Sequence, residues 1–119
     1  MVINTNGLEF SDDEDFFGVK FMHRDLGQLS PKAERTVVVM HAPIGSDQFP
    51  KDESEDYLEM VTKYPNLQFG LCGHIHSTAI HHPFENHVPY YQTACAEKLT
   101  YLLFHLKADG TYTYEEIFV

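Results

Sequence analysis

Two short apolar runs in the middle of the chain have the pattern of buried strands. Residues Thr36–Met40 form a continuous, mostly β-branched run, and Leu67–Cys72 form a second apolar run, so we predict two strands buried on both faces. Between them, residues 52–64 carry Tyr57 and Val61 on one side, which predicts an amphipathic helix. A strand, helix, strand order indicates parallel neighbours joined by a right-handed crossover.

A further helix is predicted before the first strand, over about residues 12–29. Ser11 and Glu14 stand three residues apart and fit a capping box, and Ser30–Pro31 favours an end to the helix. Between these signals apolar residues recur at roughly helical spacing. They are Phe16, Val19, Met22, Leu26 and Leu29.

After residue 77 the pattern changes to short alternating segments typical of strands. We predict four of them, at residues 78–82, 88–93, 99–106 and 111–117, forming a C-terminal antiparallel β layer. Asp109 and Gly110 indicate a two-residue hairpin turn between the last two strands. Tyr112 and Tyr114 share one face of the final strand, where we expect them to pack rather than to bind a ligand. The predicted fold class is therefore α/β.

Composition and charge limit the classes of function. The 119 residues suffice for one domain, 1–119, with a modest core, and no apolar run reaches the length of a membrane span. A formal net charge of -10 argues against binding nucleic acid or anionic membranes through general electrostatics. Cys72 and Cys95 show no metal-binding spacing and are predicted as free thiols in a reducing, cytoplasmic setting, with one disulfide as the alternative.

Three histidines follow the two predicted parallel strands directly. His41 comes after the first strand, and His74 and His76 come after the second. The carboxyl ends of parallel strands meet at one edge of a sheet, so these imidazoles should converge although 33 residues separate the first two. Neutral imidazole binds zinc, iron and manganese, and Gly73 is expected to allow close backbone approach. The pattern predicts a transition-metal site.

These two motifs resemble a known family. A hydrophobic strand ending in His41-Ala42-Pro43, followed by a strand ending in Gly73-His74-Ile75-His76, is similar to the last two motifs of calcineurin-like metallophosphoesterases. The resemblance covers residues 10–119 and implies the C-terminal half of that family's α/β/β/α sandwich.

The resemblance implies a dinuclear metal centre that hydrolyses phosphate esters, with manganese, iron or zinc as the ions. His41 and His74 would bind one ion and His76 the other. The family also carries Asp-x-His, Gly-Asp and Gly-Asn-His-Asp/Glu motifs before His-x-Pro, and none of these occurs in this sequence. The chain is therefore expected to be a fragment that is inactive alone.

His81 and His82 follow the second motif closely and are candidates for lining a substrate pocket. Their alternative role is as alternating polar positions on a strand, which the pattern favours. His23, His87 and His105 carry no spacing argument.

Two further classes of function stay open beside the hydrolase fragment. One is a small histidine-rich module that binds metal without catalysis, although closed structural zinc sites usually include cysteines at short spacing. The other is an interaction domain that pairs with a separate N-terminal half. Bare apolar strands would also favour self-association.

Overall fold

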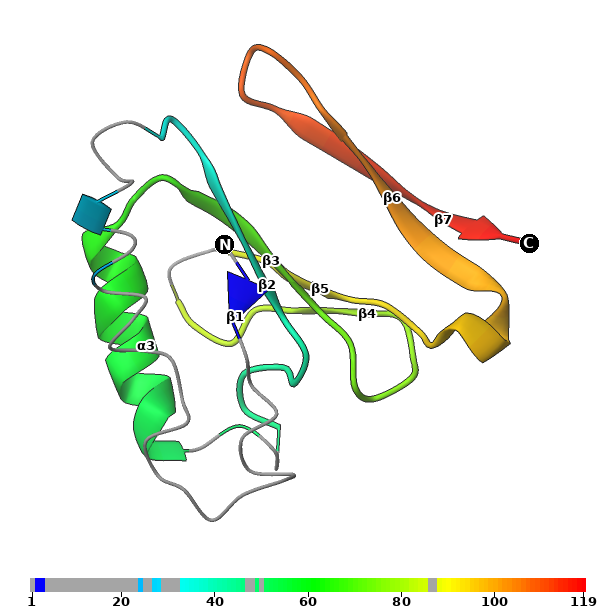
Figure 1. Cartoon of the computed structure of the whole chain (residues 1–119), viewed down its shortest axis with the longest axis horizontal. Coiled ribbons are helices and arrows are strands. Elements are labelled where there is room, and N and C mark those ends of the chain that lie inside the picture. Colours follow the sequence, from blue (N-terminus) through cyan, green and yellow to red (C-terminus); the bar gives the residue numbers. More distant parts are fainter. Residues whose placement is uncertain are drawn as a thin grey trace.

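A mixed sheet forms the middle layer, with helix α3 (Lys51–Lys63) on one side and a β-hairpin on the other (Figure 1). The computed structural model describes residues 2–3, 24, 27–28, 33–46, 49, 51–85 and 88–119. Within these residues the hairpin consists of β6 (Thr100–Leu106) and β7 (Tyr112–Phe118). A short 3-10 helix, η2 (Ala96–Lys98), precedes the hairpin.

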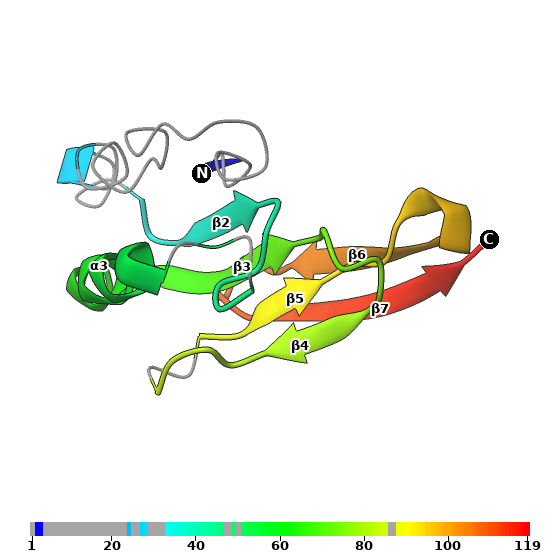
Figure 2. The ribbon, with the colours of Figure 1, turned by 90° about the horizontal axis from the view of Figure 1, so that it is seen from below.

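The described part of the sheet has five strands. In spatial order they are β1 (Val2–Ile3), β2 (Thr36–Met40), β3 (Leu67–Cys72), β5 (Tyr90–Gln92) and β4 (Ala79–His81). Figure 2 shows β2, β3, β5 and β4 side by side. The β1–β2, β2–β3 and β3–β5 pairs are parallel, and β4 runs antiparallel to β5. The mixed α/β class predicted from the sequence is confirmed.

The central prediction of two parallel strands joined through a helix is correct. β2 and β3 have the predicted bounds, and Val38 pairs with Gly70 in the parallel register. Helix α3 begins and ends one residue earlier than predicted. The helix predicted at residues 12–29 lies outside the described residues except for residues 24, 27 and 28, which are helical.

The predicted antiparallel C-terminal layer is only partly correct. β6 and β7 form a separate antiparallel pair, but β4 and β5 belong to the main sheet. β5 inserts between β3 and β4 and pairs in parallel with β3. Alternating local patterns predict a strand but do not encode its place in the sheet, so this arrangement was missed.

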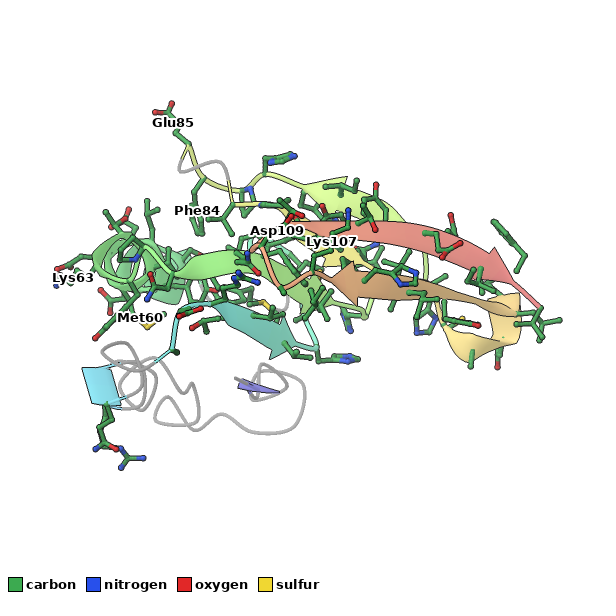
Figure 3. The ribbon with its side chains drawn as sticks, turned by 90° about the horizontal axis from the view of Figure 1, so that it is seen from above. Met60, Lys63, Phe84, Glu85, Lys107 and Asp109 are labelled. Carbon is green, nitrogen blue, oxygen red and sulfur yellow. The ribbon has the colours of Figure 1, made fainter. Side chains whose placement is uncertain are left out.

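The core between α3 and the sheet is made of fully buried side chains. Tyr57 and Met60 are 0% exposed, because the helix turns them onto Val38 and Tyr90 of the sheet. The Tyr57 and Tyr90 hydroxyls share a hydrogen bond of 2.8 Å, so both polar groups are satisfied inside the core. Lys63 lies on the solvent side, as Figure 3 shows, and forms an exposed ion pair with Glu59.

Gly70 lets the Tyr90 ring lie directly on β3. A Cβ atom added at Gly70 would come within 2.2 Å of the ring of Tyr90, its partner on the neighbouring strand. No side chain larger than hydrogen fits at this position without movement of that ring.

The opposite face of the sheet is covered by stacked aromatic rings. Phe69 of β3 stacks on Phe104 at 4.9 Å between ring centroids and contacts Tyr112 at 4.5 Å. Tyr91 of β5 contacts Tyr114 at 4.6 Å and shares a hydrogen bond of 3.0 Å with the Tyr112 hydroxyl. Tyr112 and Tyr114 are therefore packing residues, as predicted.

Polar contacts fix the turn of the hairpin to the start of β2 and β3. The Arg35 guanidinium donates to the carbonyl oxygens of Lys107 at 2.7 Å and Ala108 at 3.1 Å. The Gln68 amide donates to the carbonyl oxygen of Gly110 at 2.7 Å. Figure 3 shows Lys107 and Asp109 at this turn, at the end of the hairpin nearer α3.

The hairpin turn is longer than the predicted two-residue turn. The Lys107 N–H donates to Thr111 and the Gly110 N–H donates to Lys107, which encloses a three-residue loop. Gly110 has a positive φ of 97° and Asp109 does not, whereas a two-residue type I′ turn needs positive φ at both positions. The Asp109 carboxylate instead accepts hydrogen bonds from the Thr111 N–H and hydroxyl. The first of these bonds lowers the pKa of Asp109 below its ordinary value.

The two central strands differ in burial, although both were predicted to be buried on both faces. β3 follows the prediction, with buried residues facing both α3 and the hairpin. β2 does not, because Val39 is 36% exposed on the face that carries the hairpin over β3. Among the described residues, no helix is both long and apolar enough to cross a membrane.

Candidate functional site

The loops after β2 and β3 lie side by side at one edge of the sheet (Figure 1). Because β2 and β3 run parallel, both strands end at the same edge of the sheet, as the sequence predicted. A backbone hydrogen bond of 2.9 Å from the Gly73 N–H to the His41 carbonyl oxygen joins the two loops. The first residue of each histidine motif is thus fixed relative to the other.

His41 and His74 are in direct side-chain contact. His41 Nε2 and His74 Nδ1 are 3.0 Å apart, and the two rings meet edge to face with centroids 5.0 Å apart. One ring nitrogen donates and the other accepts, so the contact needs a protonated nitrogen on one side only. Two imidazoles 33 positions apart in the sequence therefore converge on one point.

His74 and His76 both have left-handed backbone conformations, which is uncommon for residues other than glycine. Their φ angles are 66° and 58°. The Ile75 N–H donates to the Gly73 carbonyl oxygen at 2.8 Å, which makes His74 the centre of a γ-turn with positive φ. Each such residue costs about 1–3 kcal/mol of backbone strain and persists only where its surroundings hold it.

The role predicted for Gly73 is wrong. A Cβ atom at this position would meet no heavy atom within 4 Å, and Gly73 does not have a positive φ. The close approach of the loops depends on a backbone hydrogen bond that any residue except proline can donate. The unusual conformations fall on the two histidines themselves.

His76 is exposed at the same loop. Among the described residues, no three His, Cys, Asp or Glu side chains are grouped so that they could hold a metal ion together. The structure therefore brings together two of the three predicted metal ligands, His41 and His74.

The contacting pair has the dimensions of two ligands of one metal ion. Imidazole nitrogens bind such ions at about 2.1 Å, so two of them at angles of about 90–110° lie roughly 3.0–3.4 Å apart. The observed separation of 3.0 Å between His41 Nε2 and His74 Nδ1 falls at the lower end of this range. Neutral imidazole is a common metal ligand and suits zinc and iron. The separation is compatible with a shared ion, and it is also that of the hydrogen bond between the two rings.

His81 and His82 differ in their surroundings. His81 lies on β4, and its Nε2 is 2.9 Å from the side-chain oxygen of Gln92. His82 follows the strand and is exposed. His81 is thus hydrogen-bonded to a residue of the neighbouring strand, and a pocket-lining role for His81 or His82 stays a prediction.

Gln92 is a residue that sequence reasoning missed. It is 1% exposed, and its amide nitrogen donates to the Ser77 carbonyl oxygen at 2.7 Å and to the Ser77 hydroxyl at 3.1 Å. The strand pattern could have indicated its burial. Gln92 stands two positions after Tyr90 on a predicted strand, so both side chains lie on the same buried face.

A side-chain contact links the end of the histidine loop to the hairpin. The Glu116 carboxylate of β7 accepts a hydrogen bond of 2.7 Å from the Thr78 hydroxyl, directly after the loop.

Cys72, directly before the loop, is a buried free thiol, and burial raises its pKa to about 11. Cys72 is therefore protonated at neutral pH and is a packed thiol rather than a ligand, as predicted. Cys95 is also free.

A cavity of about 410 Å³ lies at the other end of β3, away from the histidines. Its lining residues come from the end of α3, the start of β3 and the segment before β5. They are Val61, Thr62, Tyr64, Pro65, Leu67, Gln68 and Val88. None of the candidate site residues lines it.

Comparison with known proteins adds no assignment. No protein-family model matches the chain, and no curated protein shows significant similarity to it. The function must be inferred from the site itself.

Proposed function

We propose that this chain provides histidine ligands of a metal-dependent phosphoesterase site, of the calcineurin-like kind that its two histidine motifs resemble. The observation that carries the proposal is the 3.0 Å contact between His41 Nε2 and His74 Nδ1. It supports the proposal because the two motifs converge at one edge of the sheet, and the spacing of their nitrogens is compatible with two ligands of one ion.

In this proposal each of the three histidines serves as a metal ligand. His41 and His74 would hold one ion of manganese, iron or zinc. His76, two residues further along the same loop, is proposed as a ligand of a second ion. Bound divalent ions would polarise a phosphoryl oxygen of a phosphate ester and so favour its hydrolysis. The local positive charge would also attract an anionic substrate to a chain whose formal net charge is -10.

The 119 residues contain none of the carboxylate motifs that the resemblance implies. Neutral imidazoles do not bridge two dications, so we expect negligible hydrolysis by this chain alone. Pairing with a chain that carries those motifs would complete the site. Manganese-supplemented assays with p-nitrophenyl phosphate and its bis-ester test this expectation, and robust turnover that His76→Ala abolishes would contradict it.

Isothermal titration with manganese, zinc and cobalt tests the metal site directly. His41→Ala and His74→Ala should each weaken binding at least about tenfold, because each removes one of two adjacent ligands. His105→Ala is the matched control, since His105 lies on the hairpin in an exposed pair with Glu115. Equal affinity in the wild type and in His74→Ala would exclude the site.

A second function is a histidine metal-binding module without catalysis. The observation that favours it is the absence, among the described residues, of a carboxylate grouped with the histidine pair. The two functions differ in one measurement: a module binds metal through His41 and His74 but gains no hydrolysis when the complementary motifs are supplied on a second chain.

A further inference from the structure

The loop that carries His74 and His76 is held at both of its ends. At its start the Gly73 N–H donates to the His41 carbonyl oxygen at 2.9 Å. At its end the Gln92 amide nitrogen donates to the Ser77 carbonyl oxygen at 2.7 Å and to the Ser77 hydroxyl at 3.1 Å. Residues 74–76 between these anchors include the two left-handed histidines.

The orientation of the Gln92 amide follows from its partners. A backbone carbonyl oxygen only accepts hydrogen bonds, so the amide nitrogen must face Ser77 and the amide oxygen must face His81. His81 therefore donates from Nε2, at 2.9 Å. One buried side chain thus ties together the end of the histidine loop, β5 and β4.

The strain in the loop requires such an anchor. Left-handed backbone at His74 and His76 persists only when surrounding contacts hold it. Gln92 is 1% exposed on β5, between β3 and β4, whereas Ser77 is exposed. Without Gln92, water can replace the bond at Ser77, so the loop would be released without leaving a buried group unsatisfied. Gln92 is therefore better suited to restrain the loop than to stabilise the fold.

We propose that Gln92 is a positioning residue for the histidine loop: by holding Ser77 it keeps His74 in the conformation that meets His41. This inference rests on the proposed function only where metal binding is the readout. The restraint itself is a property of the metal-free chain and is measurable without an ion.

Two variants test the restraint. Gln92→Leu removes both hydrogen bonds with a smaller, apolar side chain. Gln92→Met removes both bonds at similar volume. Amide hydrogen exchange at Ile75, whose N–H donates to Gly73 inside the loop, should become about fivefold faster in both, the factor for one net hydrogen bond. The amides of β2 and β3 should exchange as in the wild type.

Cobalt binding tests the consequence for the proposed site. Both variants should bind Co²⁺ about tenfold more weakly than the wild type, a loss typical of removing a residue that orients a ligand, and their visible d–d bands should change at saturation. Tyr90→Phe is the matched control. It removes a buried hydrogen bond to Tyr57 from the same face of β5 but leaves Ser77 untouched, so both readouts should stay unchanged.

Each outcome has a separate meaning. If Gln92→Met does not fold, Gln92→Leu carries the test. Unchanged exchange at Ile75 in a folded variant overturns the proposal, whatever happens to cobalt binding. A wild type that binds no cobalt overturns the metal site and leaves the exchange measurement to decide the role of Gln92.

Discussion

Helix α3 and hairpin β6–β7 cover opposite faces of β3, and they do so by different means. On the helix side Tyr57 and Met60 are 0% exposed, and the hydroxyls of Tyr57 and Tyr90 form a buried hydrogen bond. On the hairpin side Phe69 and Tyr91 of the sheet are buried, but the hairpin rings that cover them are partly open to water, with Tyr114 41% exposed. The difference indicates that the helix face supplies most of the stability, whereas polar contacts at its ends position the hairpin.

Truncation of one tyrosine on each face tests this division and has the largest expected effect. Tyr57→Ala should lower the free energy of unfolding by about 3–5 kcal/mol, as for a large ring removed from a closed core. Tyr114→Ala should lower it by only about 1–2 kcal/mol, because part of the ring is already in water. Urea unfolding followed by circular dichroism measures both. Equal losses of unfolding free energy would contradict the conclusion that the helix face supplies most of the stability.

The close contact between Gly70 and Tyr90 gives a smaller effect on the helix face. Gly70→Ala should destabilise the protein by about 2 kcal/mol, because the new methyl group would overlap the Tyr90 ring. Gly73→Ala is the matched control three residues away, where a Cβ atom meets nothing, and its effect should stay within about 0.5 kcal/mol. Denaturant midpoints that shift equally would show that the ring moves aside freely.

Alkaline pH should weaken the helix face through its buried hydroxyls. Burial raises the pKa of Tyr90 to about 12 and raises that of Tyr57 further, in each case from an ordinary value of 10.0. The unfolded chain therefore loses these protons first, so stability is intact below pH 10 and falls as pH rises above it. The expected slope is about 1 kcal/mol per pH unit for each group.

Tyr90→Phe isolates the contribution of one hydroxyl to this loss. The variant should show a shallower decline in the free energy of unfolding between pH 10 and 12, measured by urea unfolding at fixed pH steps. Tyr91, on the hairpin side, also has a raised pKa because of burial, so a residual slope is expected. An unchanged slope would show that Tyr90 does not titrate with unfolding.

The helix side of the fold was predictable because its signals are local. The β-branched run of β2, the apolar run of β3 and the periodicity of α3 each fix one element. The meeting of His41 and His74 followed from their shared place after parallel strands. Metal binding by His41, His74 and His76 stays a prediction.

Features that depend on distant residues were not predictable in the same way. The insertion of β5 between β3 and β4 depends on pairing between strands that are distant in the sequence, and the exposure of Val39 depends on how far the hairpin reaches over the sheet. The three-residue hairpin loop depends on the hydrogen bonds that the Thr111 N–H and hydroxyl donate to the Asp109 carboxylate. Gln92 could be placed on a buried face from the sequence, but its partner Ser77 lies 15 positions away.

The smallest expected effect concerns the contact that fixes the hairpin turn. Arg35→Ala removes two hydrogen bonds, to Lys107 and Ala108, at a partly exposed site, so the loss should be about 1 kcal/mol. Arg35→Lys should restore less than half of it, because a single ammonium cannot reproduce the planar fork that spans two carbonyl groups.

If the contact positions the hairpin rather than stabilising the whole fold, its removal should act locally. Faster amide exchange is then expected at Lys107 and Gly110, whose N–H groups close the turn, with the β2–β3 amides unchanged. Exchange that accelerates equally in the hairpin and in the central strands would mean that the two faces of β3 unfold together. It would then be wrong to conclude that the helix face stabilises the fold while polar contacts only position the hairpin.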